Sequence, residues 1–371
     1  MKSRRTFLAL ATLAASALFA SAPANCLAAD TQAAPKTVPS AVMEKIYNEV
    51  KTPHKYGIVL KADDKNPRIA ADSPSVFRAN EKWYMTYIVF DGRGYETHLA
   101  ESTNLLDWKK LGKIMSFTKS TWDANQKAGY IALQDYTWGG SYSLEKHAGR
   151  YWLSYLGGAE RGYEKGMLGV GVASTEDATV AKEWTRHPSP VMLPTDKDAR
   201  WYDNHVIYKS TIIRDKTKTL GHEFVMFYNA KGKKKHEKHN AGVERIATAV
   251  SDDLINWKRY GDAPAVDNNS GISGDAFMAK IDDVWVMFYF GAFWKPKAFD
   301  TFACSYDLKT WTKWTGPNLV EPSEPYDNTF AHKPLVFKYK GVVYHFYNAV
   351  GKSGRCIALA TSEDLGKSKI K

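Results

Sequence analysis

Four acidic residues of this chain are candidates for chemistry because each stands at or near the start of a stretch of β-like sequence. They are Asp72, Asp203, Glu244 and Asp275. Two carboxyl groups that face each other can divide a reaction, one donating a proton and the other accepting one or activating water. Like charges also raise each other's pKa when they are brought together. These acids are far apart in the sequence, so a catalytic role requires a fold that gathers them.

An internal repeat could bring them together. Its template, residues 72–115, contains an aromatic strand, a Gly-rich loop and a closing turn that ends in Trp108. The aromatic strand returns in four later segments, at residues 151–155, 224–228, 285–289 and 344–347. The closing turn returns at residues 251–257 and 305–311. Five copies predict an array of similar units, each of which needs its neighbours to bury its hydrophobic face.

Each repeat reads as four short strands separated by polar turns, which is typical of a propeller blade. We therefore predict an all-β fold: a five-bladed β-propeller with four-stranded blades and a short N-terminal helix. The last copy lacks residues for its outer strand, so we expect residues 56–60 to supply this strand and close the ring. The expected blades cover residues 72–115, 138–192, 202–266, 274–320 and 327–371.

The part of the sequence ahead of the repeats divides in two. Residues 1–29 combine a basic start with an apolar run and small residues at candidate cleavage sites, as in a signal peptide of the Sec or twin-arginine type. We therefore expect a periplasmic or secreted protein. Residues 30–54 are expected to form a linker and a helix from Ser40 to Val50, with Ser40 as the N-cap. The propeller then occupies residues 55–371.

Composition narrows the class of protein further. Hydrophobic residues make up 44% of the 371 residues and aromatic residues 13%, which predicts a large core and argues against disorder. Outside the signal no apolar run is long enough to span a membrane. Cys304 and Cys356 are expected to be buried and unpaired. The net charge of +11 includes a basic run at residues 231–239, which is either a solvated loop or a collar for an anionic polymer.

In a propeller the first strand of each blade is innermost, and its start lies on the same rim as the loop between the second and third strands. The expected first-strand starts are Asp72, Gly140, Asp203, Asp275 and His332. The loops add further acids, including Glu164 and Glu244. The residues that we expect to bind substrate around this rim are Trp138, His205, Arg245, Trp294, His332, Lys333 and Arg355.

Three patterns in the sequence resemble the five-bladed-propeller glycoside hydrolases related to families 43, 32, 117 and 130. They are Asp-Ser-Pro at 72–74, the Ser-x-Asp-Leu-x-x-Trp turns, and Ala-His-Lys-Pro at 331–334. In family 43 the blade-one Asp is a general base, a blade-three Asp orients and tunes, and a blade-four Glu is the general acid. Asp72 and Asp203 match the first two positions, whereas the third position holds Asp275. The resemblance therefore leaves either Glu244 or Asp275 as the acid.

The resemblance implies an exported glycoside hydrolase that cleaves a terminal sugar from a polysaccharide or oligosaccharide. We expect inversion, with Asp72 as the base, which requires catalytic carboxyl groups about 6.5–9.5 Å apart. Basic residues on the rim favour an anionic glycan. We expect a monomer, and no interaction with nucleic acid, because the sequence lacks a recognisable binding motif.

Two other functions remain open. A phosphorylase of the family 130 type would need a cluster of Arg, Lys and His around phosphate, which His332, Lys333, Arg245 and Arg355 could supply. A carbohydrate-binding propeller without catalysis would keep the aromatic residues but would not use the acids. No cofactor is expected to be required. Related propellers sometimes hold calcium or another cation on the axis near a histidine such as His332, although no loop here has calcium-binding spacing.

Overall fold

The computed structural model describes residues 37–233 and 242–366. The expected signal peptide at 1–29, the start of the linker and much of the basic run lie outside the described residues. Within them the chain is all-β apart from α1 (Ser40–Val50), which confirms the predicted fold class. No helix in the described part is long and apolar enough to cross a membrane.

Helix α1 has the predicted bounds but not the predicted cap. Pro39 is the N-cap, and no side chain caps the helix, so the assignment of Ser40 as N-cap was wrong. Met43, Ile46 and Val50 are buried. Because they are spaced three and four residues apart, they form a single apolar stripe that packs into the largest hydrophobic cluster.

The strands pair antiparallel with their sequence neighbours in runs of four. The runs are β2 (Ala70–Ala79), β3 (Lys82–Phe90), β4 (Tyr95–Ser102) and β5 (Lys109–Met115); β6 (Gln126–Ile131), β7 (Tyr151–Gly158), β8 (Leu168–Thr175) and β9 (Thr185–Arg186); β10 (Val206–Arg214), β11 (Phe224–Lys231), β12 (Glu244–Ser251) and β13 (Lys258–Tyr260); β14 (Ile272–Ile281), β15 (Val284–Ala292), β16 (Ala298–Ser305) and β17 (Thr312–Lys313); and β18 (Phe330–Tyr339), β19 (Val342–Gly351) and β20 (Gly354–Thr361) with β1 (His54–Leu60).

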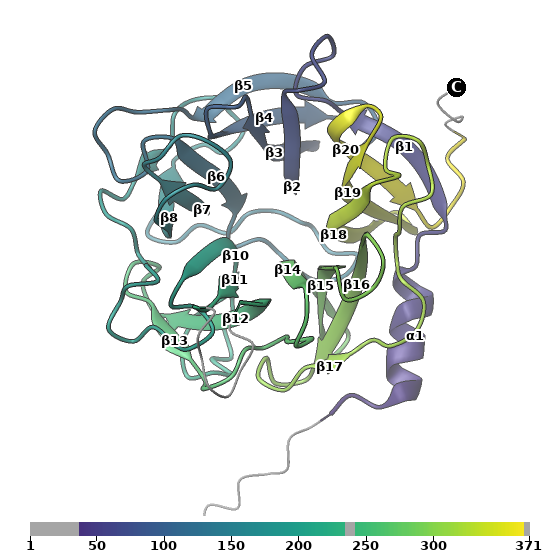
Figure 1. Cartoon of the computed structure of the whole chain (residues 1–371). Helices are drawn as coiled ribbons and strands as arrows, with labels where there is room; N and C mark the ends of the chain where they lie inside the picture. The colour runs from purple at the N-terminus through teal and green to yellow at the C-terminus, as the bar shows by residue number, and fades with distance from the viewer. Residues whose placement is uncertain (1–36, 234–241, 367–371) are drawn as a thin grey trace, which may run out of the picture. The chain divides into compact units, whose positions relative to one another are not determined.

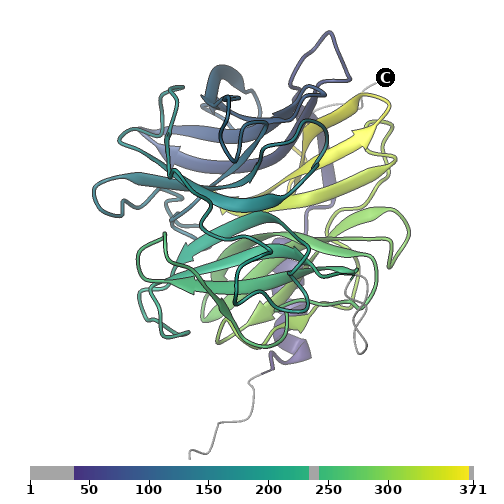
Figure 2. The same cartoon turned by 60° about the vertical axis from the view of Figure 1, so that its left-hand side comes forward.

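The runs join into one four-stranded and two eight-stranded sheets. A single parallel pairing links the runs within each larger sheet, β4 to β6 in one and β12 to β14 in the other. The first strands contact one another in the order β2, β6, β10, β14 and β18, and β18 contacts β2. They therefore surround a common centre, in a propeller-like arrangement (Figure 1). In Figure 2 the yellow strands β18–β20 lie beside the purple and blue strands of the first run, in agreement with the contacts of β2 with β19 and β20.

The second run begins earlier in the sequence than we expected. Its first strand is β6, whereas Gly140 lies in the following loop, so the predicted first-strand start at Gly140 was wrong. Strand β6 escaped detection because all six of its residues are buried, including the polar Gln126 and Lys127. A strand buried on both faces lacks the alternation of polar and apolar residues by which half-buried strands are recognised.

The predicted closing strand is confirmed. Strand β1 pairs antiparallel with β20, from His54 opposite Thr361 to Leu60 opposite Ile357. The outer strand of the last run thus comes from the N-terminal side of the repeats. Cys304 on β16 and Cys356 on β20 are buried and free, as predicted.

Candidate active site

A cavity of about 190 Å³ lies where the first strands meet the loops between the second and third strands. Three acidic side chains line it: Glu164, Glu244 and Asp275. Three basic side chains line it as well: Lys209, Lys333 and Arg355. Most of the remaining wall is aromatic and comes from Tyr95, Tyr130, Tyr163, Tyr208, Phe290, Phe293 and Phe330, together with His332. Aromatic faces beside charged groups suit a sugar, which has both apolar faces and hydroxyl groups.

Irregularities in three first strands set the direction of the side chains at this cavity. The pairing register shifts in β2, β14 and β18 at the same place in each strand. One residue in each shift has a positive φ: Ser73 at 44°, Asp275 at 55° and Lys333 at 63°. A bulge of this kind re-aims side chains at the inner end of a strand. The register places Asp275 level with Ser73 and Lys333, so it is not equivalent to Asp72, as we had predicted.

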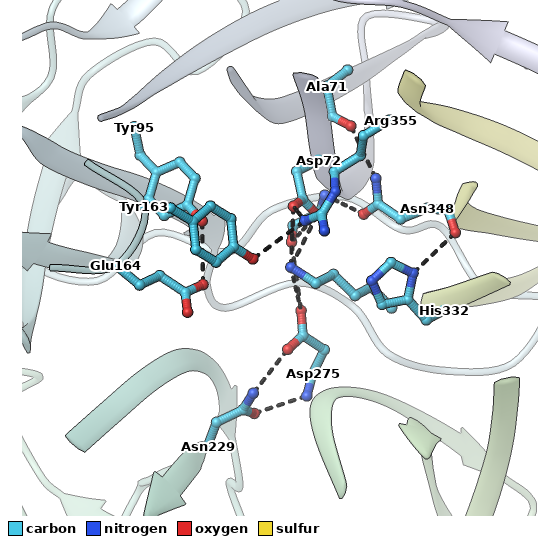
Figure 3. Close-up of polar contacts among 12 residues, drawn as sticks. Ala71, Asp72, Tyr95, Tyr163, Glu164, Asn229, Asp275, His332, Asn348 and Arg355 are labelled. Atoms are coloured by element: carbon cyan, nitrogen blue, oxygen red, sulfur yellow. Dashed lines mark hydrogen bonds and ion pairs between the residues drawn. The ribbon is translucent and has the colours of Figure 1, made fainter. Parts of the chain in front are cut away.

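Asp72 lies behind the cavity wall in a cluster of cations (Figure 3). Arg355 Nη1 pairs with its Oδ2, and Lys333 Nζ lies 3.0 Å from its Oδ1. Burial alone would raise the pKa of Asp72, but the charges of Lys333 and Arg355 hold it well below its usual range. Asp72 is therefore a weak base, and its main contribution is to fix the two cations that line the cavity.

Two asparagines that the sequence analysis missed hold these bulges. Asn348 on β19 accepts a hydrogen bond from the backbone N of Ser73 at 2.6 Å and donates to the carbonyl of Ala71 at 3.0 Å. Asn229 on β11 accepts from the backbone N of Asp275 at 2.8 Å. The signal was present in the repeats, since Phe-Tyr-Asn-Ala occurs both at 227–230 and at 346–349.

Asn229 also joins two of the carboxyl groups. Its amide nitrogen donates to Asp275 Oδ1 at 2.8 Å and to Glu244 Oε1 at 3.0 Å. Two oxygens that share one donor must be closer together than the separation of about 6.5–9.5 Å that leaves room for an attacking water. Glu244 and Asp275 therefore do not form the acid and base of an inverting pair.

Glu164 and Glu244 face the cavity with carboxyl groups that favour protonation. Burial raises the pKa of Glu244 to about 8, and the charges of Glu164 and Asp275 add to the effect. Burial also raises the pKa of Glu164, whose Oε1 accepts a hydrogen bond from the Tyr95 hydroxyl at 3.2 Å. The sequence analysis noted Glu164 on the rim but did not select it, although Gly-Tyr-Glu at 162–164 repeats 94–96. One protonated carboxyl and one charged carboxyl suit general acid–base catalysis.

Comparison with known proteins decides the class. Neither the models of protein families nor the curated proteins searched give a match. Among solved structures, one described as a complex of BT0996 with RGII and one described as "Glycoside hydrolase" are each 47% identical in sequence, with a TM-score of 0.86. Each match covers 90% of this protein and 98% of the other. The chain therefore belongs to the glycoside hydrolases.

More distant structures support the fold of this glycoside hydrolase. A thermostable family-43 glycoside hydrolase is 14% identical with a TM-score of 0.56, over 79% of this chain and 89% of that one. A structure described in terms of the GH130 family is 13% identical with a TM-score of 0.59, over 86% of this chain and 95% of that one. The predicted resemblance to glycoside hydrolases is confirmed, and these two matches add support for the fold alone.

Asp203 lies outside the cavity of this glycoside hydrolase and has a structural environment. It is fully buried, accepts a hydrogen bond from the Tyr228 hydroxyl at 2.8 Å and pairs with Arg259 Nε. The backbone N of Arg200 donates to its other oxygen at 2.6 Å. Both carboxylate oxygens are therefore used within the fold. The expected gathering of Asp203 with the other three acids does not occur.

Of the seven residues predicted to bind substrate, the structure brings His332, Lys333 and Arg355 to the cavity. Trp138 donates to Glu49 of α1 at 2.8 Å, and Trp294 donates to the carbonyl of Ile272 at 2.8 Å. Neither lines the cavity.

The other two predicted binding residues also lie elsewhere. Arg245 is fully buried and donates to Asp267 at 2.6 Å, and it does not line the cavity. His205 lies in a separate shallow groove with Met167 and Lys233.

A cation site has little support in the described residues. No group of three or more His, Cys, Asp and Glu side chains within residues 37–233 and 242–366 is placed to hold a metal ion. His332 instead contacts the ring of Phe290, with centroids 5.3 Å apart, and its Nδ1 lies 3.2 Å from the carbonyl oxygen of Asn348. Burial lowers the pKa of His332 to about 3, with help from the nearby cations, so the ring is neutral at physiological pH.

Proposed function

We propose that this glycoside hydrolase removes a terminal sugar from RGII or a closely similar glycan. The observation that carries the proposal is the pair Glu164 and Glu244, both with raised pKa, in one small cavity. Its volume of about 190 Å³ is below the range of about 300–1,000 Å³ that is common for larger ligands, which favours one sugar ring over an extended polymer. The glycan is proposed from the RGII complex of a relative with 47% identity.

In the proposed mechanism Glu244 is the general acid. Its raised pKa keeps it protonated at neutral pH, so it can donate a proton to the glycosidic oxygen as the bond to the sugar breaks. Glu164 removes a proton from the attacking water, and the resulting hydroxyl group bonds to the sugar carbon. We propose inversion, with this pair taking the place of the Asp72 pairing expected from sequence. Asp72 is held by two cations and would be too weak a base.

The test is release of sugar from purified RGII oligosaccharides, followed by chromatography, with and without inorganic phosphate. Glu244→Gln and Glu164→Gln are each expected to lower the rate by about 10²–10⁴-fold. Glu160→Gln is the matched control, since Glu160 is an exposed glutamate near Glu164 in the same loop, and it should leave the rate unchanged.

Other results would revise the proposal in defined ways. A sugar phosphate formed only with added phosphate would favour the phosphorylase alternative. Release of internal fragments would contradict cleavage at the terminus. Proton NMR of the first product anomer tests inversion. Near-full activity of Glu244→Gln would remove Glu244 from the mechanism.

We further propose that the enzyme is exported to the periplasm or beyond as a monomeric five-bladed propeller. The basic and apolar start of the sequence supports export. The antiparallel runs of four strands and the ring of contacts between first strands support five blades. The net charge of +11 supports attraction of an anionic glycan to the protein surface.

A further inference from the structure

Lys209 is a buried lysine that the fold leaves without a partner. It lies on β10, is 7% exposed and lines the cavity. Its amino group has no hydrogen bond or ion pair within residues 37–233 and 242–366, and its nearest described interaction is with the ring of Tyr130, 5.3 Å from the centroid. Burying an amino group without a partner costs free energy, because water is removed and not replaced.

A second buried lysine shows how the same fold treats such a group elsewhere. Lys127 on β6 is fully buried, and its Nζ donates to Thr118 Oγ1 at 3.0 Å and to the carbonyl of Ala124 at 3.4 Å. Lys127 lies outside the cavity lining. The contrast associates the missing partner of Lys209 with its position at the cavity.

The backbone of β10 directs Lys209 inward. The pairing register of this strand shifts between Ile207 and Ser210. In a regular strand, consecutive residues point to opposite faces, but here both Tyr208 and Lys209 line the cavity. The fold therefore uses a strand irregularity to bring an unpartnered amino group to the site, as it does for Asp275 and Lys333.

We propose that Lys209 is a substrate-binding residue whose amino group donates hydrogen bonds to hydroxyl oxygens of the sugar ring in the cavity. This inference rests on the proposed function, since it places a sugar there. Hydroxyl oxygens fit better than an anionic group because Glu164, Glu244 and Asp275 line the same cavity and would repel a second negative charge. The sugar would supply the acceptors that the protein withholds.

The test compares Lys209→Met with Lys127→Met. Methionine keeps the length of the side chain and removes the donor. We expect the melting temperature to stay equal or rise for Lys209→Met and to fall for Lys127→Met, which loses two hydrogen bonds. We expect KM for RGII oligosaccharides to rise about 10–100-fold for Lys209→Met, as for loss of hydrogen bonds to a charged group. An unchanged KM would overturn the inference, and so would a large fall in melting temperature with unchanged KM.

A binding measurement separates this inference from the proposed function. Calorimetry with a fixed panel of pentoses, deoxyhexoses, hexoses and uronic acids needs no hydrolysis. A sugar that binds the wild type but binds Lys209→Met at least tenfold more weakly supports the inference even if RGII is not cleaved. Equal binding to both proteins, or binding of inorganic phosphate alone, overturns it.

A further measurement uses the wild type, in case Lys209→Met does not fold. The singly deoxygenated analogues of the sugar that binds are compared with that sugar. At least one should bind at least tenfold more weakly, because it leaves the amino group without an acceptor. Equal binding of every analogue would overturn the inference.

Discussion

At the scale of single residues, the environment of each acid decides its role more than its position in the repeat does. Asp72 and Glu244 are both carboxylic acids beside the cavity, yet their pKa values move in opposite directions. Two cations stabilise the charged form of Asp72, whereas burial and neighbouring acids destabilise the charged form of Glu244. This separation identifies Glu244 as the residue that carries a proton at neutral pH.

The first prediction concerns the pH dependence of the rate. If Glu244 must be protonated to act, kcat/KM should fall about tenfold per pH unit above pH 8, since the pKa of Glu244 is raised to about 8. On the acid side, activity should be lost at a pH above the ordinary glutamate value of 4.5, because Glu164 also has a raised pKa. A rate profile of the wild type from pH 4 to pH 10 measures both limbs. A rate that stays flat up to pH 10 would contradict Glu244 as the acid.

Stability supplies an independent check on Glu244. The pKa of Glu244 is higher in the folded state than its ordinary value of 4.5, so the unfolded chain gives up this proton first as the pH rises. The folded enzyme should therefore lose free energy of unfolding between about pH 4.5 and pH 8. Glu244→Gln lacks this loss, so its melting temperature should exceed that of the wild type increasingly across that window. Glu160→Gln should follow the wild type throughout.

At the scale of elements, a recurring trio ties the outer strand of a run to its inner end. Three buried aspartates each accept a hydrogen bond from a tyrosine on the second strand and pair with a cation on the outermost strand. The trios are Asp123 with Tyr155 and Arg186, Asp203 with Tyr228 and Arg259, and Asp327 with Tyr347 and Lys55. Asp203 thus has the same surroundings as two aspartates in other runs, which supports a structural role.

The second prediction follows from this equivalence. Asp203→Ala should lower the free energy of unfolding by about 3–5 kcal/mol, because it leaves Arg259 buried with part of its charge compensation removed. The folded fraction should turn over substrate within about twofold of the wild-type rate. Denaturant unfolding and rates corrected for the folded fraction measure the two effects. Asp327→Ala is the control and should behave alike, whereas a hundredfold slower turnover for Asp203→Ala alone would restore a catalytic role.

The repeats made most of the elements predictable, but not their register. Aromatic strands and Ser-x-Asp turns recur because every run needs the same buried second strand and the same tight connection, so they can be recognised by comparing copies. A bulge leaves no such mark. The one-residue shift that separates Asp72 from Asp275 depends on hydrogen bonds from Asn348 and Asn229, which lie on other strands. For the same reason Lys209, which a shift in β10 brings to the cavity, was not predicted.

At the scale of the whole described molecule, β1 joins the two ends of the repeat array. Thr361 and His54 face each other in the pairing of β20 with β1, although they are 307 residues apart in sequence. Lys55 on the same strand pairs with the buried Asp327 of the last run. Without β1 the last run would keep three strands, and β20 would present an unpaired edge. This pairing is thus the contact that holds the first and last parts of the described residues together.

The last prediction tests whether this junction limits stability. A disulfide between His54→Cys and Thr361→Cys would close a very long loop and should raise the free energy of unfolding by about 2–4 kcal/mol, because long loops lose the most entropy in the unfolded state. The melting temperature of the oxidised variant is compared with that of the same variant after reduction, so effects of the substitutions cancel. The native Cys304 and Cys356 are buried and should not interfere.

A short-loop disulfide is the matched control for this junction. Tyr339→Cys with Val342→Cys bridges facing residues at the β18–β19 turn and closes only a few residues. Its effect on melting temperature should be clearly smaller, because the entropy removed from the unfolded state grows with loop length. Equal gains for both disulfides would mean that loop length is not the cause. No gain from a fully formed bridge between positions 54 and 361 would mean that unfolding starts elsewhere, while β1 is still paired with β20.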